Sequence, residues 1–303
     1  MKASIQKSIL LPQETSKTLL LGSFGAAIGV VVVLFNANAP ISEAFISTPE
    51  FVIWQLLICS QTAFLAMAIG PLMTVLQQLK TYSSNHKWNL VHSGIIITIL
   101  FWIPSLVRVL YISDIQWPLA NQMLRLSIII LIAYVPTLMA TAGIWLVQVA
   151  FQSLSQLEGA ELIPIYLQHL KNMGGFLWIL GIMVSLATLA TASLRNALTA
   201  IDPALDDKFP EALVWIYGAY YSVLLLVIYL PAYNARLIAG EKILDRYLLL
   251  PLPNHDDWAS IYTKRKQLAE YLGLEESIMD SLQTLLPILA PLISGFIPTL
   301  LSS

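Results

Sequence analysis

Residues 172–194, NMGGFLWILGIMVSLATLATASL, decide the class of fold because they contain no Asp, Glu, Lys or Arg. A helix needs about 20 mostly apolar residues, at ~1.5 Å each, to cross the hydrocarbon core of a bilayer, and this stretch is long enough. Its apolar residues do not alternate with polar ones, and an open sheet cannot satisfy its backbone hydrogen bonds in lipid. The stretch therefore predicts a transmembrane helix near residues 174–196.

Other long intervals without charged residues lie on both sides of this stretch. They predict further helices near 19–38, 51–77, 89–111, 126–152 and 212–236. Only 11% of the 303 residues are charged, against about 25% in soluble domains. We therefore expect an all-α polytopic membrane protein: a bundle of about six transmembrane helices with a short cytoplasmic helical tail and a Pro-containing hydrophobic C-terminal segment.

The first apolar run has some features of a signal peptide. Lys2, Lys7 and Lys17 precede it, and Ala37-Asn38-Ala39 resembles a small-residue cleavage site. Pro40 follows this tripeptide directly, which argues against cleavage. We expect the run to be retained as the first membrane helix.

The distribution of Lys and Arg predicts the orientation of these helices. With six spans and the N-terminus inside, twelve of the 16 basic residues fall on the inner side and four, Arg108, Arg125, Arg195 and Lys208, on the outer side. We therefore expect the N-terminus and residues 236–280 in the cytoplasm, and the cell inner (plasma) membrane as the location. The chain would divide into an N-terminal tail (1–17), the bundle (18–239), a charged helical segment (240–280) and a hydrophobic C-terminal segment (281–303).

The C-terminal segment is apolar enough to insert but contains Pro287, Pro291 and Pro298, each of which removes a helical hydrogen bond. Its larger apolar residues repeat with alternating spacings of four and three, which is typical of a helix–helix seam: Ile278, Leu282, Leu285, Leu289, Leu292 and Phe296. Three alternatives remain: a seventh span, a helix lying in the interface, or a hydrophobic tail packed on neighbouring subunits. The proline content favours a broken, membrane-associated or packed segment over a clean span.

The charged segment before it predicts one helix, Trp258–Tyr271, which Gly273 would end. Lys264, Arg265 and Lys266 on this helix are candidates for contact with lipid headgroups or a partner protein. The alternative is a solvated helix face, since three basic residues fall short of a lipid-binding cluster.

Several classes of chemistry lack support in the sequence. The net charge of −2 argues against nucleic-acid binding, and the one cysteine, Cys59, excludes a disulfide framework. No zinc-binding helix, nucleophile elbow, P-loop or dinucleotide motif occurs, and of the four histidines only His92 is near an expected span. We therefore expect no enzyme activity, no catalytic residue, no metal site and no cofactor.

Polar residues recur on one face of two expected spans. One stripe runs through Tyr134, Thr137, Thr141, Trp145, Gln148 and Gln152, and the other through Gly181, Ser185, Thr188, Ala192 and Arg195. The candidate pore-lining residues are Thr137, Thr141, Gln148, Gln152, Ser185, Thr188 and Arg195. The alternative is packing, because small residues allow close helix approach and hydroxyls and amides form bonds between helices. For the stripe of Gly22, Ala26 and Gly29 in the first span, packing is the favoured interpretation.

These observations lead to two functional hypotheses. The first is a channel or pore-type component, oligomeric with itself or with other membrane subunits, that passes an unidentified small solute or ion. It is favoured over a coupled transporter because no acidic residue lies deep in a span and no inverted repeat is visible. The second is a non-conducting scaffold subunit of a membrane assembly that docks partners through residues 236–303.

Overall fold

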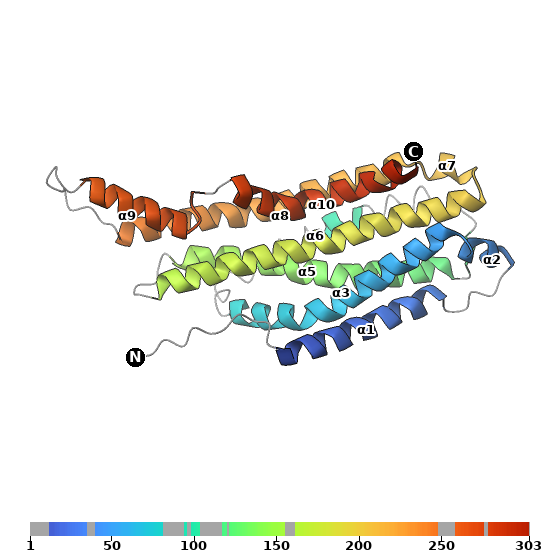
Figure 1. The fold of residues 1–303 in the computed structure, drawn as a ribbon, viewed down its shortest axis with the longest axis horizontal. Coiled ribbons are helices and arrows are strands. Elements are labelled where there is room, and N and C mark those ends of the chain that lie inside the picture. The colour runs from blue at the N-terminus through green and yellow to red at the C-terminus, as the bar shows by residue number, and fades with distance from the viewer. Residues whose placement is uncertain are drawn as a thin grey trace.

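The computed structural model describes residues 12–34, 40–80, 94–95, 98–103, 117–119, 121–154, 161–247, 258–275 and 278–302. Apart from short helical pieces at 94–95 and 98–103, its elements are α1 (Pro12–Leu34), α2 (Pro40–Ile46), α3 (Pro49–Leu79), α5 (Gln122–Leu154), α6 (Leu162–Ile201), α7 (Leu205–Lys208), α8 (Ala212–Tyr247), α9 (Trp258–Tyr271) and α10 (Ile278–Ser302). The described part of the chain contains helices and no strand. The long helices lie side by side in an elongated bundle (Figure 1).

Five segments in the described residues are long and apolar enough to cross a membrane: Ser16–Leu34, Pro49–Leu79, Leu124–Leu154, Leu162–Ile201 and Leu205–Tyr247. Large apolar side chains also cover their outer surface, as at Leu20, which is 71% exposed. Five such helices fit an integral multi-pass membrane protein. The span expected near 89–111 lies outside the described residues except for 94–95 and 98–103, so a sixth crossing stays a prediction.

Two helices extend well beyond the expected spans. α6 begins at Leu162 rather than near residue 174, and α8 continues to Tyr247 rather than ending near residue 236. The physical reason is that a charged residue marks the limit of the membrane, whereas a helix ends only at a cap or breaker. Glu, Lys and Arg are good helix formers, so α8 continues through Glu241, Lys242 and Arg246.

The buried apolar residues form two clusters. One joins the start of α3, through Phe51 and Trp54, to Leu126 of α5 and Leu198 of α6. The other is larger and extends to the opposite end of the bundle. Its residues there include Leu79, Leu154, Leu162 and Leu244. α3 therefore ends at the far end of the bundle from the point where α5 begins.

α10 packs along α6 and α8 (Figure 1). The contact face consists of Pro287, Ile288, Pro291, Ser294 and Gly295, all of them buried. The row of large apolar residues proposed above as a seam lies mainly on the outside, with Leu285 and Leu289 each 41% exposed and Phe296 40% exposed. The row therefore does not form the contact with α6 and α8, because inside a membrane close packing of small residues, not burial of leucine, brings helices together. Its role as a seam against neighbouring subunits stays a prediction.

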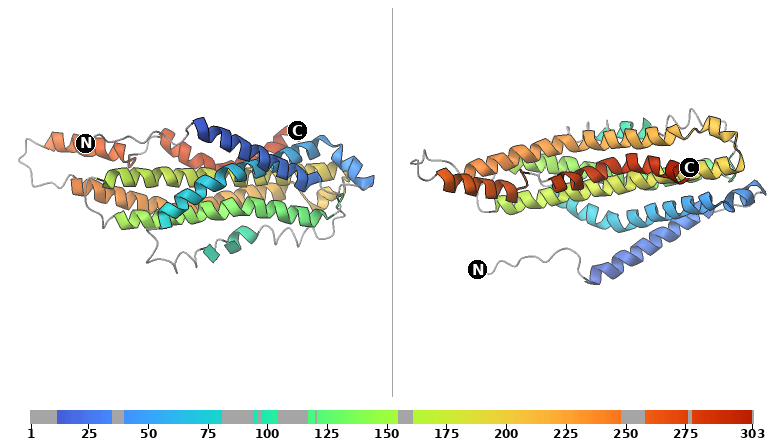
Figure 2. Two further views of the ribbon diagram at one scale, coloured as in Figure 1. Left: turned by 90° about the horizontal axis from the view of Figure 1, so that it is seen from below. Right: turned by 45° about the horizontal axis from the view of Figure 1, so that its top comes forward.

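α1 packs chiefly on α3 and lies outermost in the bundle (Figure 2). A Cβ on Gly25 would lie 2.4 Å from the carbonyl oxygen of Thr62, and one on Gly29 would lie 2.9 Å from the Cα of Cys59. Gly22 is also buried, so Gly22 and Gly29 of the predicted small-residue stripe face α3, while Ala26 is only partly buried. Gly25 completes the contact and was not part of that stripe.

α9 is fastened to the end of the bundle by its C-terminal turn. The buried guanidinium of Arg236 donates to the carbonyl oxygen of Gly273, whose φ of +67° lets the chain turn after α9. The Tyr166 hydroxyl donates to the carbonyl oxygen of Leu272 at 3.3 Å. Arg265 of α9 also pairs with Asp245 of α8 at 2.9 Å, so the two helices lie side by side beyond the other helices (Figure 1).

Candidate functional site

A cavity of about 150 Å³ lies between α3, α5, α6 and α8, close to the helical residues 98–103; we call it the central cavity. Its walls include residues of both buried clusters, such as Trp54 and Leu194 from one and Phe101 and Val184 from the other. The cavity therefore occupies the place where the two apolar cores meet without filling the space between them.

Gln61 of α3 is the polar residue that stands out in this cavity. Its side chain is 1% exposed, and neither amide atom has a hydrogen-bond partner in the described part of the chain. A buried amide without a partner costs several kcal/mol in hydrocarbon, and ordinary protein interiors contain few of them. A polar guest in the cavity, water or ligand, would satisfy it.

Three threonine hydroxyls line the cavity beside Gln61, and each donates to the carbonyl four residues earlier in its own helix. Thr137 of α5 donates to Ala133 at 2.8 Å, while Thr188 and Thr191 of α6 donate to Val184 and Ala187 at 3.0 and 2.9 Å. Their hydrogens are thereby used locally, and their lone pairs remain as acceptors. These threonines therefore offer acceptors, while the Gln61 amide can both donate and accept.

A second hollow of about 260 Å³ lies between α5 and α8 and opens to the surface; we call it the α5–α8 groove. Gln148 and Gln152 of α5 line it opposite Pro231, Asn234 and Lys242 of α8. Pro231 lacks an N–H, so the carbonyl four residues earlier in α8 loses its helical donor. The groove thus presents amides, a lysine and a helix break.

The polar stripe of α5 passes both hollows. Tyr134 and Thr137 line the central cavity, and Gln148 and Gln152 line the groove. At ~1.5 Å per residue, Tyr134 and Gln152 are about 27 Å apart along the helix, close to the ~30 Å of a hydrocarbon core. Between the hollows the helices are closely packed, with Ile144, Leu225 and Ile228 at most 1% exposed.

The other candidates of the sequence lie outside both hollows. Thr141 is buried and donates to Thr137 within α5 at 2.8 Å. Ser185 is partly buried, and its hydroxyl has no hydrogen-bond partner among the described residues. Their assignment to a pore wall stays a prediction.

Arg195 connects the end of α6 to the turn that precedes α8. Its guanidinium donates to the Phe209 carbonyl at 2.8 Å, to the Asn196 amide oxygen at 3.0 Å and to the Asp206 carboxylate. Phe209 itself lines the central cavity, so Arg195 positions one wall of it. The structure thus gives this residue a clear packing role, and its predicted place at a pore mouth stays a prediction.

The three basic residues of α9 do not act as one cluster. Arg265 is paired with Asp245, whereas Lys264 and Lys266 are exposed on the same helix. Contact with headgroups or a partner stays a prediction for them.

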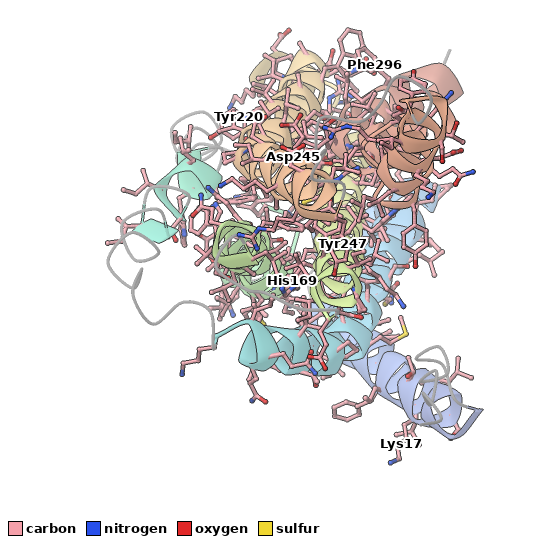
Figure 3. All side chains as sticks on the ribbon, turned by 90° about the vertical axis from the view of Figure 1, so that its left-hand side faces the viewer. Lys17, His169, Tyr220, Asp245, Tyr247 and Phe296 are labelled. Atoms are coloured by element: carbon pink, nitrogen blue, oxygen red, sulfur yellow. The ribbon has the colours of Figure 1, made fainter. Side chains whose placement is uncertain are left out.

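Gln61 and His169 are among the buried polar residues that the sequence patterns did not single out. Gln61 continues the spacing of four and three set by Trp54 and Ile58 on the buried face of α3, and that pattern could have identified it. The span expected near residues 174–196 did not include His169, which belongs to α6 because this helix begins at Leu162. Its ring lies 5.9 Å from that of Phe151, edge to face, between α5 and α6 (Figure 3). His92 lies outside the described residues.

No group of three or more His, Cys, Asp or Glu side chains within the described ranges could hold a metal ion. No protein-family model, curated protein sequence or solved structure matches this chain. The two hollows are therefore the features of the molecule that point to a function.

Proposed function

We propose that this protein is a conduit for a small solute in a membrane, with the path following the interface of α5 and α8 from the central cavity to the α5–α8 groove. The observation that carries the proposal is the Gln61 amide, buried in the central cavity with no hydrogen-bond partner among the described residues. Inside a membrane, polar groups that lack protein partners are typical of solute pathways.

Ile144, Leu225 and Ile228 would close the path in the conformation described. These residues are buried together in the larger apolar cluster, between the two hollows. Apolar constrictions of this kind can stop water and solutes by dewetting. The protein would then conduct only when α5 and α8 separate, or when a more polar side chain hydrates the constriction.

Six spans and the cytoplasmic location of the N-terminus and of α9 belong to this proposal. α3 ends and α5 begins at opposite ends of the bundle, which supports one further crossing between them. The distribution of Lys and Arg supports the orientation and the inner membrane as the location. The proposal also includes assembly of the conduit as a homo-oligomer.

The test is flux of small solutes and ions into liposomes that contain the purified protein. We expect Gln61→Met to reduce flux, because it replaces the amide by an apolar side chain of similar size. Ile144→Thr should increase flux, because it places a hydroxyl in the constriction. Gln55→Leu is the matched control on the same helix, since Gln55 is partly buried and lies outside the described lining of both hollows.

Flux that is absent from the wild type and from Ile144→Thr, with both folded, would overturn the conduit. The scaffold would then be the better hypothesis, and the observation that favours it is the extension of α8 and α9 past the other helices (Figure 1). Truncation after Gly273 would not test docking alone, because it would also remove α10 from the bundle. Lys264→Glu together with Lys266→Glu changes the surface alone, and loss of a co-purifying partner in that variant would support docking through α9.

A further inference from the structure

We infer that the central cavity binds a small, uncharged, ring-bearing molecule with one hydroxyl, of the benzyl alcohol or phenol type. The inference rests on the proposed function, because the solute of the conduit would occupy the same cavity. It adds the chemical class of that solute. It follows from the charge, the size, the aromatic walls and the hydrogen-bonding pattern of the cavity.

The lack of charge on the described walls disfavours an ion as the guest. None of the described residues that line the cavity is Asp, Glu, Lys, Arg or His. The two nearest arginines along the chain point their guanidinium groups at other atoms: Arg125 bonds the Val33 carbonyl, and Arg195 bonds Asp206 and Phe209. An ion in such a site would lose its hydration without a countercharge, which is far costlier than the transfer of a neutral molecule.

The size and the walls select a single ring. A protein cavity of about 150 Å³ with apolar walls is large enough for benzene. Indole and phenyl rings line this one, among them Trp54, Phe101 and Trp102. Aromatic rings attract one another in edge-to-face and offset arrangements, so an aromatic guest gains more here than an aliphatic guest of equal volume.

The hydrogen-bonding groups select a hydroxyl. The Thr137 and Thr188 hydroxyls already donate within their own helices and can offer a guest only lone pairs. A guest that bonds these two hydroxyls therefore needs a hydrogen to donate. The Gln61 amide has N–H donors and a carbonyl acceptor without partners in the described chain, so a guest oxygen that accepts and donates at once would satisfy both kinds of group.

The test measures binding at equilibrium, without flux, by the fluorescence of the cavity tryptophans in protein held in nanodiscs. Benzyl alcohol is the probe. Toluene has the ring without the hydroxyl, benzoate adds a negative charge, and benzyltrimethylammonium adds a positive one. We expect saturable quenching by benzyl alcohol, about tenfold weaker binding of toluene, as one lost hydrogen bond implies, and no saturable binding of either ion.

Gln61→Met should abolish the preference of benzyl alcohol over toluene by weakening the alcohol about tenfold and leaving toluene unchanged. Thr188→Val, which keeps the shape of the side chain, provides a second variant in case Gln61→Met does not fold. Gln55→Leu should retain the full preference. Because only the ratio of two ligands is compared, a general loosening of the bundle would not imitate the expected result.

Three results would overturn the inference: a preference that survives in both folded cavity variants, tighter binding of benzyltrimethylammonium, or no saturable binding of any probe. The aromatic walls could hold an organic cation by cation–π attraction, and the ammonium probe tests that class directly. Binding of benzyl alcohol as expected, with no flux of any solute, would overturn the conduit and leave this binding site. Flux of ions with no binding of benzyl alcohol would overturn this binding site and leave the conduit.

Discussion

Gly181 of α6 lies directly against the backbone of Pro287 in α10: a Cβ added at Gly181 would be 2.5 Å from the Pro287 carbonyl oxygen. Pro291 has no N–H, so this carbonyl lacks the donor that a helix usually provides four residues later. The absence of a side chain on Gly181 lets α6 approach and cover it. A proline break in α10 is thus accommodated by a glycine in the neighbouring helix.

This contact makes Gly181→Ala destabilising. The added methyl meets backbone atoms that cannot move aside, so we expect a loss of about 1–3 kcal/mol in the free energy of unfolding. Gly175→Ala on the same helix is the control, because nothing lies within 4 Å of its added Cβ. It should leave stability unchanged or raise it by up to ~1 kcal/mol, since alanine favours the helix. Denaturant titration in detergent measures both, and equal effects would contradict the close approach.

Ser222 of α8 also holds α10 in place. Its hydroxyl oxygen accepts the backbone N–H of Leu292 at 3.1 Å. We expect Ser222→Ala to cost about 0.6 kcal/mol, up to ~1.7, as for other hydrogen bonds between membrane helices. Ser60→Ala removes an exposed hydroxyl that bonds Leu56 within its own helix, and its unfolding free energy should equal that of the wild type. A larger loss in Ser60→Ala than in Ser222→Ala would be inconsistent with this role.

Arg195 should matter more than the acid with which it pairs. Arg195→Met removes donors to Asn196, Asp206 and the Phe209 carbonyl, and we expect it to cost about 1.5–3 kcal/mol. The carboxylate of Asp206 is 62% exposed, so Asp206→Asn should cost at most ~1 kcal/mol. Limited proteolysis of the turn between α6 and α8 reports the loosening. Cleavage that rises equally in both variants would show that the ion pair, and not the Phe209 carbonyl, holds the turn.

Tyr166 fastens the end of α9 to α6. Its hydroxyl donates to the Leu272 carbonyl. We expect Tyr166→Phe to lower the free energy of opening this junction by about 1 kcal/mol. Amide hydrogen exchange in residues 268–275 should then be about fivefold faster. Tyr262→Phe is the control, because Tyr262 is 69% exposed on α9. The junction would have to be held by other contacts if exchange were the same in both variants.

The sequence predicted the helical class and most of the long helices, because insertion into lipid depends on the composition of each segment taken alone. Residues 172–194 identify α6 by their lack of charge, yet they could not show that α6 begins at Leu162. The sequence showed the polar stripe of α5 as a period of three and four. It could not show that the two halves of the stripe face different hollows, because this depends on which helix lies opposite each turn.

The row of leucines in the C-terminal segment also shows that a sequence pattern does not reveal which helix lies opposite it. In a water-soluble protein, leucines at spacings of four and three would be buried against another helix. In a membrane, lipid solvates them as well as protein does. The face that docks is instead the one with Pro287, Pro291 and Gly295, which meets Gly181 and Gly218. Periodicity alone could not choose between the two faces of α10.

The sequence by itself determined that this chain is helical and contains several segments apolar enough to cross a membrane, since both properties follow from local runs of residues and the cost of charge in lipid. Only the tertiary structure decided that Gln61 is buried in a cavity, that Arg195 is bonded to the turn after α6, and that α10 lies between glycines of α6 and α8. Each of these depends on atoms far apart in the chain, and their juxtaposition is fixed by the packing of whole helices.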